Sequence, residues 1–224
     1  MEDRYVPLLR NAYWKLSGGQ KVYCVCFHDV SDSLSTFSVT PEEFHAIITA
    51  AKERIIGIDE LGIKNIIDPI VLTFDDGFES LISTVAPYLY SEKIPFTSYI
   101  TVDYINREGY LTEDQLKELS QNKYCTIGSH MCSHSKTRQM TIKQVEDEWV
   151  RSKKILQDLT GKEVCHAALP YGSYNSCSAS SKRVALKVGY KSIANTIATP
   201  FGVHSREIFR YVYQKNNDRI KNIL

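Results

Sequence analysis

The segment that most constrains the fold of this chain is an apolar run that ends abruptly in charge. Residues 71–77 read VLTFDDG, so an apolar segment delivers Asp75 and Asp76 to its end, and Gly77 then lets the backbone turn. Aspartate is depleted in strands and is almost never buried without a partner. The run predicts a buried strand whose carboxyl end carries functional acids, although a strand ending in an ordinary Asp-Gly turn remains an alternative for this segment alone.

The adjacency of the two aspartates adds a geometric condition. Successive residues of a regular strand point to opposite faces. Both carboxylates can therefore serve one site only if the backbone leaves extended geometry at this point, and Gly77 favours such a departure.

Two histidines further along the chain have the spacing of metal ligands. His130 and His134 follow the segment 125–129 and are four positions apart, which would place them on one side of a helical turn. Imidazole nitrogens together with a carboxylate suit Zn²⁺, with a fourth position left open in catalytic sites. A chance pair of surface histidines is the alternative. Cys132, between them, would point away from their shared face.

The rest of the chain alternates between strand and helix patterns. Thr40, Thr112 and Thr141 each begin a helix pattern with the signature of a capping box, and Gly161 follows the third helix as a stop. Apolar runs lie at 96–102, 124–128 and 165–169, and the last of these leads into a Pro-Tyr-Gly turn. Repeated strand, helix, strand units predict an α/β fold, a parallel barrel with functional residues at the carboxyl ends of its strands.

The order of three segments, 73–77, 130–134 and 169–172, resembles the polysaccharide deacetylase family, also called the NodB-homology group or carbohydrate esterase family 4. The resemblance spans roughly residues 20–215. It implies a distorted (β/α) barrel with fewer than eight parallel strands. With 224 residues and 43% hydrophobic content, we expect residues 1–224 to form a single catalytic domain.

The resemblance also implies a role for each matching position. Asp76, His130 and His134 would bind a divalent metal, with Zn²⁺ preferred and Co²⁺, Ni²⁺ or Fe²⁺ as alternatives. Asp75 would act as the general base on water made acidic by that metal. The backbone N–H at Tyr171 would stabilise the oxyanion of a tetrahedral intermediate.

Two positions depart from the family pattern. Ala168 stands where many members have an arginine that orients the base, and we hypothesise that Arg210, in the apolar stretch 208–213, enters the site instead. The family's general acid is often a late histidine, for which His204 is the candidate, although its surroundings lack the usual Leu-x-His pattern. A solvated loop histidine is the alternative for His204.

A further histidine lies early in the chain. His28 and Asp29 follow the apolar run 22–27, the expected first strand. We interpret this pair as a hydrogen-bonded strand end and not as a direct participant in catalysis.

Net charge, cysteine content and hydropathy indicate which partners and which cellular compartment to expect. A net charge of +1 gives no reason to expect nucleic acid or an anionic membrane as partner. No stretch approaches the ~18 apolar residues of a membrane helix, and residues 1–5 begin with acids, not with an apolar segment, so we expect a cytoplasmic location. In that compartment the six cysteines are expected to be reduced thiols.

The resemblance leads to an expected function with alternatives. We expect a metal-dependent deacetylase that hydrolyses an N-acetyl or O-acetyl group on a sugar. A cytoplasmic location would favour a lipid-linked or nucleotide-linked intermediate of glycan biosynthesis as substrate. The alternatives are a catalytically weak or inactive carbohydrate-binding barrel, a deformylase of a formamido sugar, and a metal hydrolase that acts on an amide outside sugars.

Overall fold

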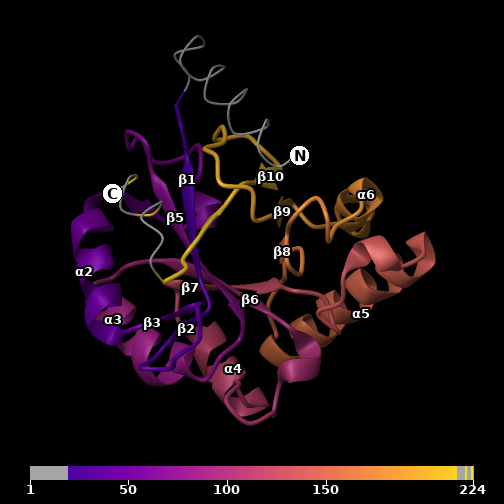
Figure 1. Ribbon diagram of the computed structural model, residues 1–224, viewed down its shortest axis with the longest axis horizontal. Coiled ribbons are helices and arrows are strands. Elements are labelled where there is room, and N and C mark those ends of the chain that lie inside the picture. Colours follow the sequence, from indigo (N-terminus) through magenta and orange to yellow (C-terminus); the bar gives the residue numbers. More distant parts are fainter. Residues whose placement is uncertain (1–19, 216–219, 221–222, 224) are drawn as a thin grey trace.

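The computed structural model describes residues 20–215 together with Ile220 and Ile223 (Figure 1), so the outermost parts of the expected domain 1–224 lie outside the described residues. A parallel sheet forms its centre. The strands of this sheet are β1 (Tyr23–Phe27), β4 (Ile55–Ile56), β5 (Ile70–Asp76), β6 (Phe96–Ile100), β7 (Cys125–Ser129), β8 (His166–Ala168), β9 (Ser192–Ala194), β10 (Glu207–Ile208) and β11 (Tyr211–Val212). A separate small parallel pair consists of β2 (Asp29–Val30) and β3 (Ser38–Val39).

The order of the strands confirms the predicted α/β barrel. Hydrogen-bonded neighbours follow the order β10-β9-β8-β7-β6-β5-β1-β11, and β4 pairs with β5 outside this path. The sheet of the described chain has nine strands, so the expectation of fewer than eight was wrong; three of the nine, β4, β10 and β11, have only two residues and leave little pattern in the sequence. Only Phe209 and Arg210 separate β10 from β11, the two ends of the order. The chain therefore joins the two edges of the distorted barrel at these residues.

Helices surround the sheet on its outer side (Figure 1). They are α2 (Pro41–Ala51), α3 (Ala86–Ser91), α4 (Glu113–Gln121), α5 (Ile142–Thr160) and α6 (Ala179–Val188). Of the helices in the described ranges, none combines the length and the apolar character that crossing a membrane requires.

The predicted caps hold these helices at their starts. Thr112 and Thr141 form complete capping boxes, and Gly161 ends α5 in the left-handed region with φ 69°. Thr40 also accepts a hydrogen bond, from the N–H of Glu43 at 3.2 Å. The Glu43 side chain, however, does not return to the cap, because it accepts a hydrogen bond from the Tyr213 hydroxyl at 2.8 Å. The hydrogen bond between Tyr213 and Glu43 has thus replaced the expected bond from the Glu43 side chain to the helix cap.

The sheet separates two buried clusters. Alternate residues of β1 face opposite ways: Phe27 packs in the larger cluster beneath the helices, and Cys24 packs in the barrel interior. Tyr99 and Phe201 fill much of that interior. A pocket of about 330 Å³ opens beyond the carboxyl ends of the strands.

Candidate active site

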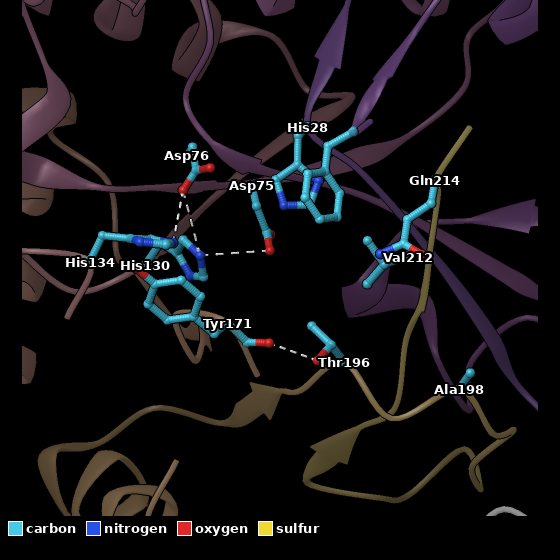
Figure 2. Close-up of a pocket in the computed structure, with 11 residues that line it drawn as sticks. His28, Asp75, Asp76, His130, His134, Tyr171, Thr196, Ala198, Val212 and Gln214 are labelled. Atoms are coloured by element: carbon cyan, nitrogen blue, oxygen red, sulfur yellow. Dashed lines mark hydrogen bonds and ion pairs between the residues drawn. The ribbon is translucent and has the colours of Figure 1, made fainter. Parts of the chain in front are cut away.

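The pocket collects residues from several strand ends, and Figure 2 shows how their side chains lie. Its lining combines ionisable, aromatic, apolar and amide groups. The lining residues are His28, Phe37, Asp75, Asp76, His130, His134, Tyr171, Thr196, Ala198, Val212 and Gln214.

The backbone at the end of β5 brings both aspartates into this pocket. Asp76 adopts a left-handed conformation with φ 71°, and Gly77 continues it with φ 84°. The chain therefore leaves extended geometry, as the paired acids require, and Asp75 and Asp76 line the same cavity. Thr101 donates to Asp76 Oδ1 at 3.4 Å.

Asp76, His130 and His134 converge on one point. Each offers a ligand atom, and these atoms all lie within 4.8 Å of one another. Asp76 Oδ1 is 3.7 Å from His130 Nε2 and 3.3 Å from His134 Nε2. His130 Nδ1 lies 2.8 Å from the carbonyl oxygen of Ala168, a contact that orients the ring with Nε2 toward the pocket.

The segment between the two histidines is not the helical turn that their spacing predicts. Residues 130–134 form an irregular loop, in which Met131 and His134 have φ values of 66° and 52°. The two rings meet because the backbone reverses through left-handed positions. Cys132 is buried and points away from the site, with its thiol 3.8 Å from the carbonyl oxygen of Glu148.

A carboxylate from α5 supports this loop, and the sequence analysis did not identify it. Glu148 Oε2 accepts hydrogen bonds from the N–H groups of Cys132 at 2.8 Å and Ser133 at 3.0 Å. The sequence held only a weak signal for this role of Glu148. Glu148 lies three positions after the buried Val145 and next to the buried Trp149, so a charged residue adjoins the inner face of an amphipathic helix.

The three converging residues fit a divalent metal ion. Burial raises the pKa of Asp76 to about 6 and lowers that of His130 to about 3, and it also lowers the pKa of His134. Both imidazoles are thus held neutral, which is the form that ligates metals. No cationic side chain of the described residues is hydrogen-bonded to the Asp76 carboxylate. Two imidazole nitrogens and one carboxylate oxygen suit Zn²⁺ and related ions.

Asp75 has a different partner. Arg210 Nη1 and Nη2 donate to Asp75 Oδ1 and Oδ2 at 2.6 and 2.8 Å, and Arg210 Nε donates to the carbonyl oxygen of Asn195 at 2.9 Å. Arg210 is fully buried at the point where the chain joins β10 to β11, with its guanidinium over the ring of Tyr99. Burial opposes the charge on Asp75, but the guanidinium outweighs this and holds the pKa of the carboxyl below its ordinary value.

Tyr171 also lies in the pocket, close to His134. Its backbone is left-handed, with φ 62°, and its carbonyl oxygen accepts a hydrogen bond from the Thr196 hydroxyl at 2.8 Å. Within residues 20–215, the N–H of Tyr171 has no hydrogen-bond acceptor. Its ring centroid is 4.7 Å from that of His134.

His28 reaches the pocket, contrary to our interpretation of it as a hydrogen-bonded strand end. Its Nδ1 atom is buried without a hydrogen-bond partner in the described part of the chain, and its ring lies 5.1 Å from that of Phe37. The interpretation holds for its neighbour, because Asp29 accepts hydrogen bonds from Ser38 and Ser80.

The structure does not bring His204 into the pocket. His204 is exposed and lies beside Gly62. It precedes β10, which runs parallel to β9, so it lies near the amino ends of the strands while the pocket lies at their carboxyl ends. This placement corrects the expectation that His204 is the general acid and agrees with the alternative of a solvated loop histidine.

The sequence matches one known protein family over more than half of its length. Residues 64–193 match the sequence profile of the family described as polysaccharide deacetylase. The relative named "Putative polysaccharide deacetylase YxkH", from Bacillus subtilis (strain 168), is 27% identical over 146 residues, or 65% of this chain and 50% of the relative. The chain thus spans about half the length of this curated relative.

Solved structures share the fold over most of the chain. IcaB from Ammonifex degensii has a TM-score of 0.78 at 19% identity and covers 92% of this chain and 96% of its own. A de-N-acetylase from Aggregatibacter actinomycetemcomitans has a TM-score of 0.78 at 15% identity, over 92% and 100%. The Streptococcus pyogenes deacetylase PplD, solved in complex with acetate, has a TM-score of 0.78 at 18% identity and covers 88% of this chain and 94% of its own. At such identities the likeness shows a common fold.

Proposed function

The chain belongs to the polysaccharide deacetylase family, and we propose that it is a metal-dependent hydrolase that removes the acetyl group from an N-acetylated sugar, with an O-acetyl group as the second option. One observation carries this proposal. Asp76, His130 and His134 converge in a pocket where Asp75 is held separately by Arg210. Two adjacent acids thus have different environments, which is the arrangement that metal-assisted hydrolysis with a general base requires.

Asp76, His130 and His134 are the residues that would hold the ion. When bound there, a divalent ion supplies Lewis acidity, which makes a water more acidic and polarises the carbonyl under attack. Asp75 accepts the proton from the attacking water. Arg210 keeps Asp75 ionised and fixes its orientation through two parallel hydrogen bonds.

The pocket also offers groups for two further roles, stabilisation of the oxyanion and protonation of the departing nitrogen. The N–H of Tyr171 is available to the oxyanion of the tetrahedral intermediate, where a fixed donor is worth roughly 3 to 4 kcal/mol. We assign the general acid to His28 in place of His204. Figure 2 shows His28 beside Asp75, on the side away from His134. An imidazole there can give a proton to the departing nitrogen while Asp75 serves the water.

Two exposed aromatic rings at the pocket support a sugar as substrate. Phe37 is 41% exposed and Tyr171 is 50% exposed, and both line the cavity. Exposed rings of this kind offer flat apolar faces to a pyranose. A cytoplasmic location, which we propose from the sequence, would favour a lipid-linked or nucleotide-linked sugar over a finished polymer.

The test measures acetate release from a panel of N-acetylated and O-acetylated sugar intermediates. We expect release by the wild type and strong loss in Asp75→Asn and His134→Ala. Asp59→Asn, which removes a carboxylate that also pairs with a histidine but lies outside the pocket, serves as the matched control and should retain activity. Equal activity in all four proteins would overturn the mechanism, and release of formate alone from formamido sugars would reassign the substrate.

A catalytically weak carbohydrate-binding barrel is the alternative function. Its main support was the alanine at position 168 in place of an arginine, and Arg210 weakens that support because it contacts the same base. Metal content separates the two possibilities. A barrel that only binds sugar has no need to retain one tightly bound divalent ion per chain, so a chain purified without metal, and unable to take it up, would favour the alternative.

A further inference from the structure

A second group of metal-ligating side chains adjoins the first. Cys26, His28 and Asp75 each place one ligand atom within 4.8 Å of the other two. We propose that these three residues form a second metal site of lower affinity, which takes a thiophilic divalent ion such as Zn²⁺, Co²⁺ or Cd²⁺ and blocks the enzyme when it fills. The blocking effect rests on the proposed function, whereas the binding does not.

The register of two neighbouring strands creates this group. Residues 24, 26 and 28 alternate along one face of β1 and its end, and this face is directed into the barrel. β1 and β5 pair in parallel with Phe27 opposite Phe74, so His28 and Asp75 leave their strands side by side. Cys26 is fully buried one step below His28, under the floor of the pocket.

Two of the three donors lack a strong partner in the described residues. The Nδ1 atom of His28 is buried with none. The Cys26 thiol makes a long contact, 3.6 Å, to the carbonyl oxygen of Phe27 and a side-chain hydrogen bond with Thr73, and sulfur is a weak partner in both. A buried imidazole nitrogen without a partner carries a desolvation cost that a bound cation would remove.

The donor set selects the kind of ion. Sulfur, imidazole nitrogen and carboxylate oxygen together suit Zn²⁺, Co²⁺ and Cd²⁺, whereas Mg²⁺ and Ca²⁺ prefer oxygen ligands. On binding, the sulfur–hydrogen bond of Cys26 breaks, the sulfur–metal bond forms, and the proton leaves to solvent. No oxidant or reductant takes part.

Arg210 makes this site weaker than the triad of Asp76, His130 and His134. Both oxygens of Asp75 already accept hydrogen bonds from the guanidinium, whose positive charge repels a second cation nearby. The triad has no such cation bonded to it, so it fills first. An ion at the second site would then engage Asp75 and His28, the proposed base and acid. Excess metal would therefore stop turnover while the triad remains full.

A Co²⁺ titration of the metal-free 224-residue chain tests the binding. We expect two equivalents to bind, the second at least tenfold more weakly, and a thiolate-to-cobalt charge-transfer band that grows only with the second. Cys26→Ser should lose the band and the second equivalent and keep the first. Cys24→Ser, on the same strand and the same buried face, should keep both. Saturation at one equivalent, a band complete with the first, or a band that survives Cys26→Ser would overturn the proposal.

A second variant covers the case in which Cys26→Ser does not fold. His28→Gln retains the thiol and removes the imidazole, so it should bind the first equivalent of Co²⁺ and lose the second. Binding of the second equivalent to His28→Gln with unchanged affinity would contradict the site.

The inhibitory effect is measured on turnover. Where acetate release is found, we expect it to fall as Zn²⁺ exceeds one equivalent, with half-inhibition moved at least tenfold higher in Cys26→Ser than in Cys24→Ser. Equal half-inhibition in the two variants would contradict the blocking role. If no substrate releases acetate, the proposed function fails, and the Co²⁺ titration still decides whether the second site exists.

Discussion

The two ends of the barrel hold similar residues with different consequences. At the amino ends, His166 Nε2 lies 3.0 Å from Asp59 Oδ1, and His166 Nδ1 lies 2.8 Å from the Ser192 hydroxyl. Both ring nitrogens are used by partners from the chain itself. At the carboxyl ends, Nε2 atoms of His130 and His134 face Asp76 with no protein hydrogen bond at good distance between them. A cluster of histidine and aspartate is therefore a candidate site when its free ligand atoms face a common point. The presence of these residue types alone does not make a site.

Backbone conformation also differs between the two clusters. Of the seven non-glycine residues with positive φ in the described chain, four lie at or beside the pocket: Asp76, Met131, His134 and Tyr171. Asp59, His166 and Ser192 lie in a short 3₁₀ helix and in two ordinary strands. Left-handed conformations cost free energy, so the four at the pocket indicate that packing elsewhere stabilises a geometry that the pocket needs.

The largest expected difference between the two ends is in turnover. Asp75→Asn keeps the size of the side chain but cannot accept the proton from water, so we expect kcat to fall by about 10²- to 10⁴-fold. The first equivalent of metal should still bind, because Asp75 is not a member of the triad. Asp59→Asn removes the corresponding carboxylate at the amino end and should stay within about twofold of wild type by the same acetate assay. If Asp59→Asn lost as much activity as Asp75→Asn, the distinction between the two ends would fail.

The pairing of Asp75 with Arg210 gives the next effect. Arg210→Met leaves a buried carboxylate unpaired and should lower the free energy of unfolding by about 3 to 5 kcal/mol. It also removes the charge that holds the pKa of Asp75 low, so burial would raise that pKa. Because the base works only when ionised, we expect turnover of Arg210→Met to recover as the pH rises. A matched Arg210→Lys variant retains the charge and should show a smaller shift of the acid limb in the pH–rate profile. An acid limb that stays at the same pH in both variants would contradict this account of Arg210.

The support that Glu148 gives to the histidine loop predicts a smaller effect, on metal affinity. Glu148→Gln keeps the shape but weakens two charge-assisted hydrogen bonds to the backbone of Cys132 and Ser133. Loss of such outer support costs roughly 10- to 100-fold in metal affinity, and a competition titration with a chelator measures it. Glu146→Gln, two residues earlier on α5, is the control and should leave the affinity unchanged.

The elements that the sequence predicted correctly are those decided by local pattern. The strand at 71–77, the threonine caps and the glycine stop of α5 each depend on residues a few positions apart. The convergence of Asp76, His130 and His134 follows from the alternating strand and helix plan, because the carboxyl ends of parallel strands share one edge. The route of the chain from His130 to His134 was wrong in detail, because spacing alone does not distinguish a helical turn from a loop with two left-handed residues.

Contacts between distant parts of the chain could not be predicted in the same way. Arg210 and Asp75 are 135 positions apart, and their contact depends on how the edges of the sheet come together; the sequence supported it only as a hypothesis. The place of His28 depends on the register of β1 against β5. His204 was misplaced because its position relative to β10 decides the end of the barrel on which it lies, and a two-residue strand leaves little pattern in a sequence.

The smallest expected effect is at the amino end, in stability and its dependence on pH. The hydrogen bond from His166 lowers the pKa of Asp59 below its ordinary value. A carboxyl with a lowered folded-state pKa contributes stability above its unfolded pKa, near ~4, and loses that contribution as the pH falls through the folded-state value. Because the Asp59 side chain is 59% exposed, solvent screening limits the contribution to less than about 1 kcal/mol. Urea unfolding should therefore show Asp59→Asn slightly less stable than wild type at neutral pH, with the difference shrinking as the pH falls below ~4. A loss of several kcal/mol, or a loss that grew on acidification, would mean that the amino-end cluster is more than a hydrogen-bonded link between the 3₁₀ helix and the sheet.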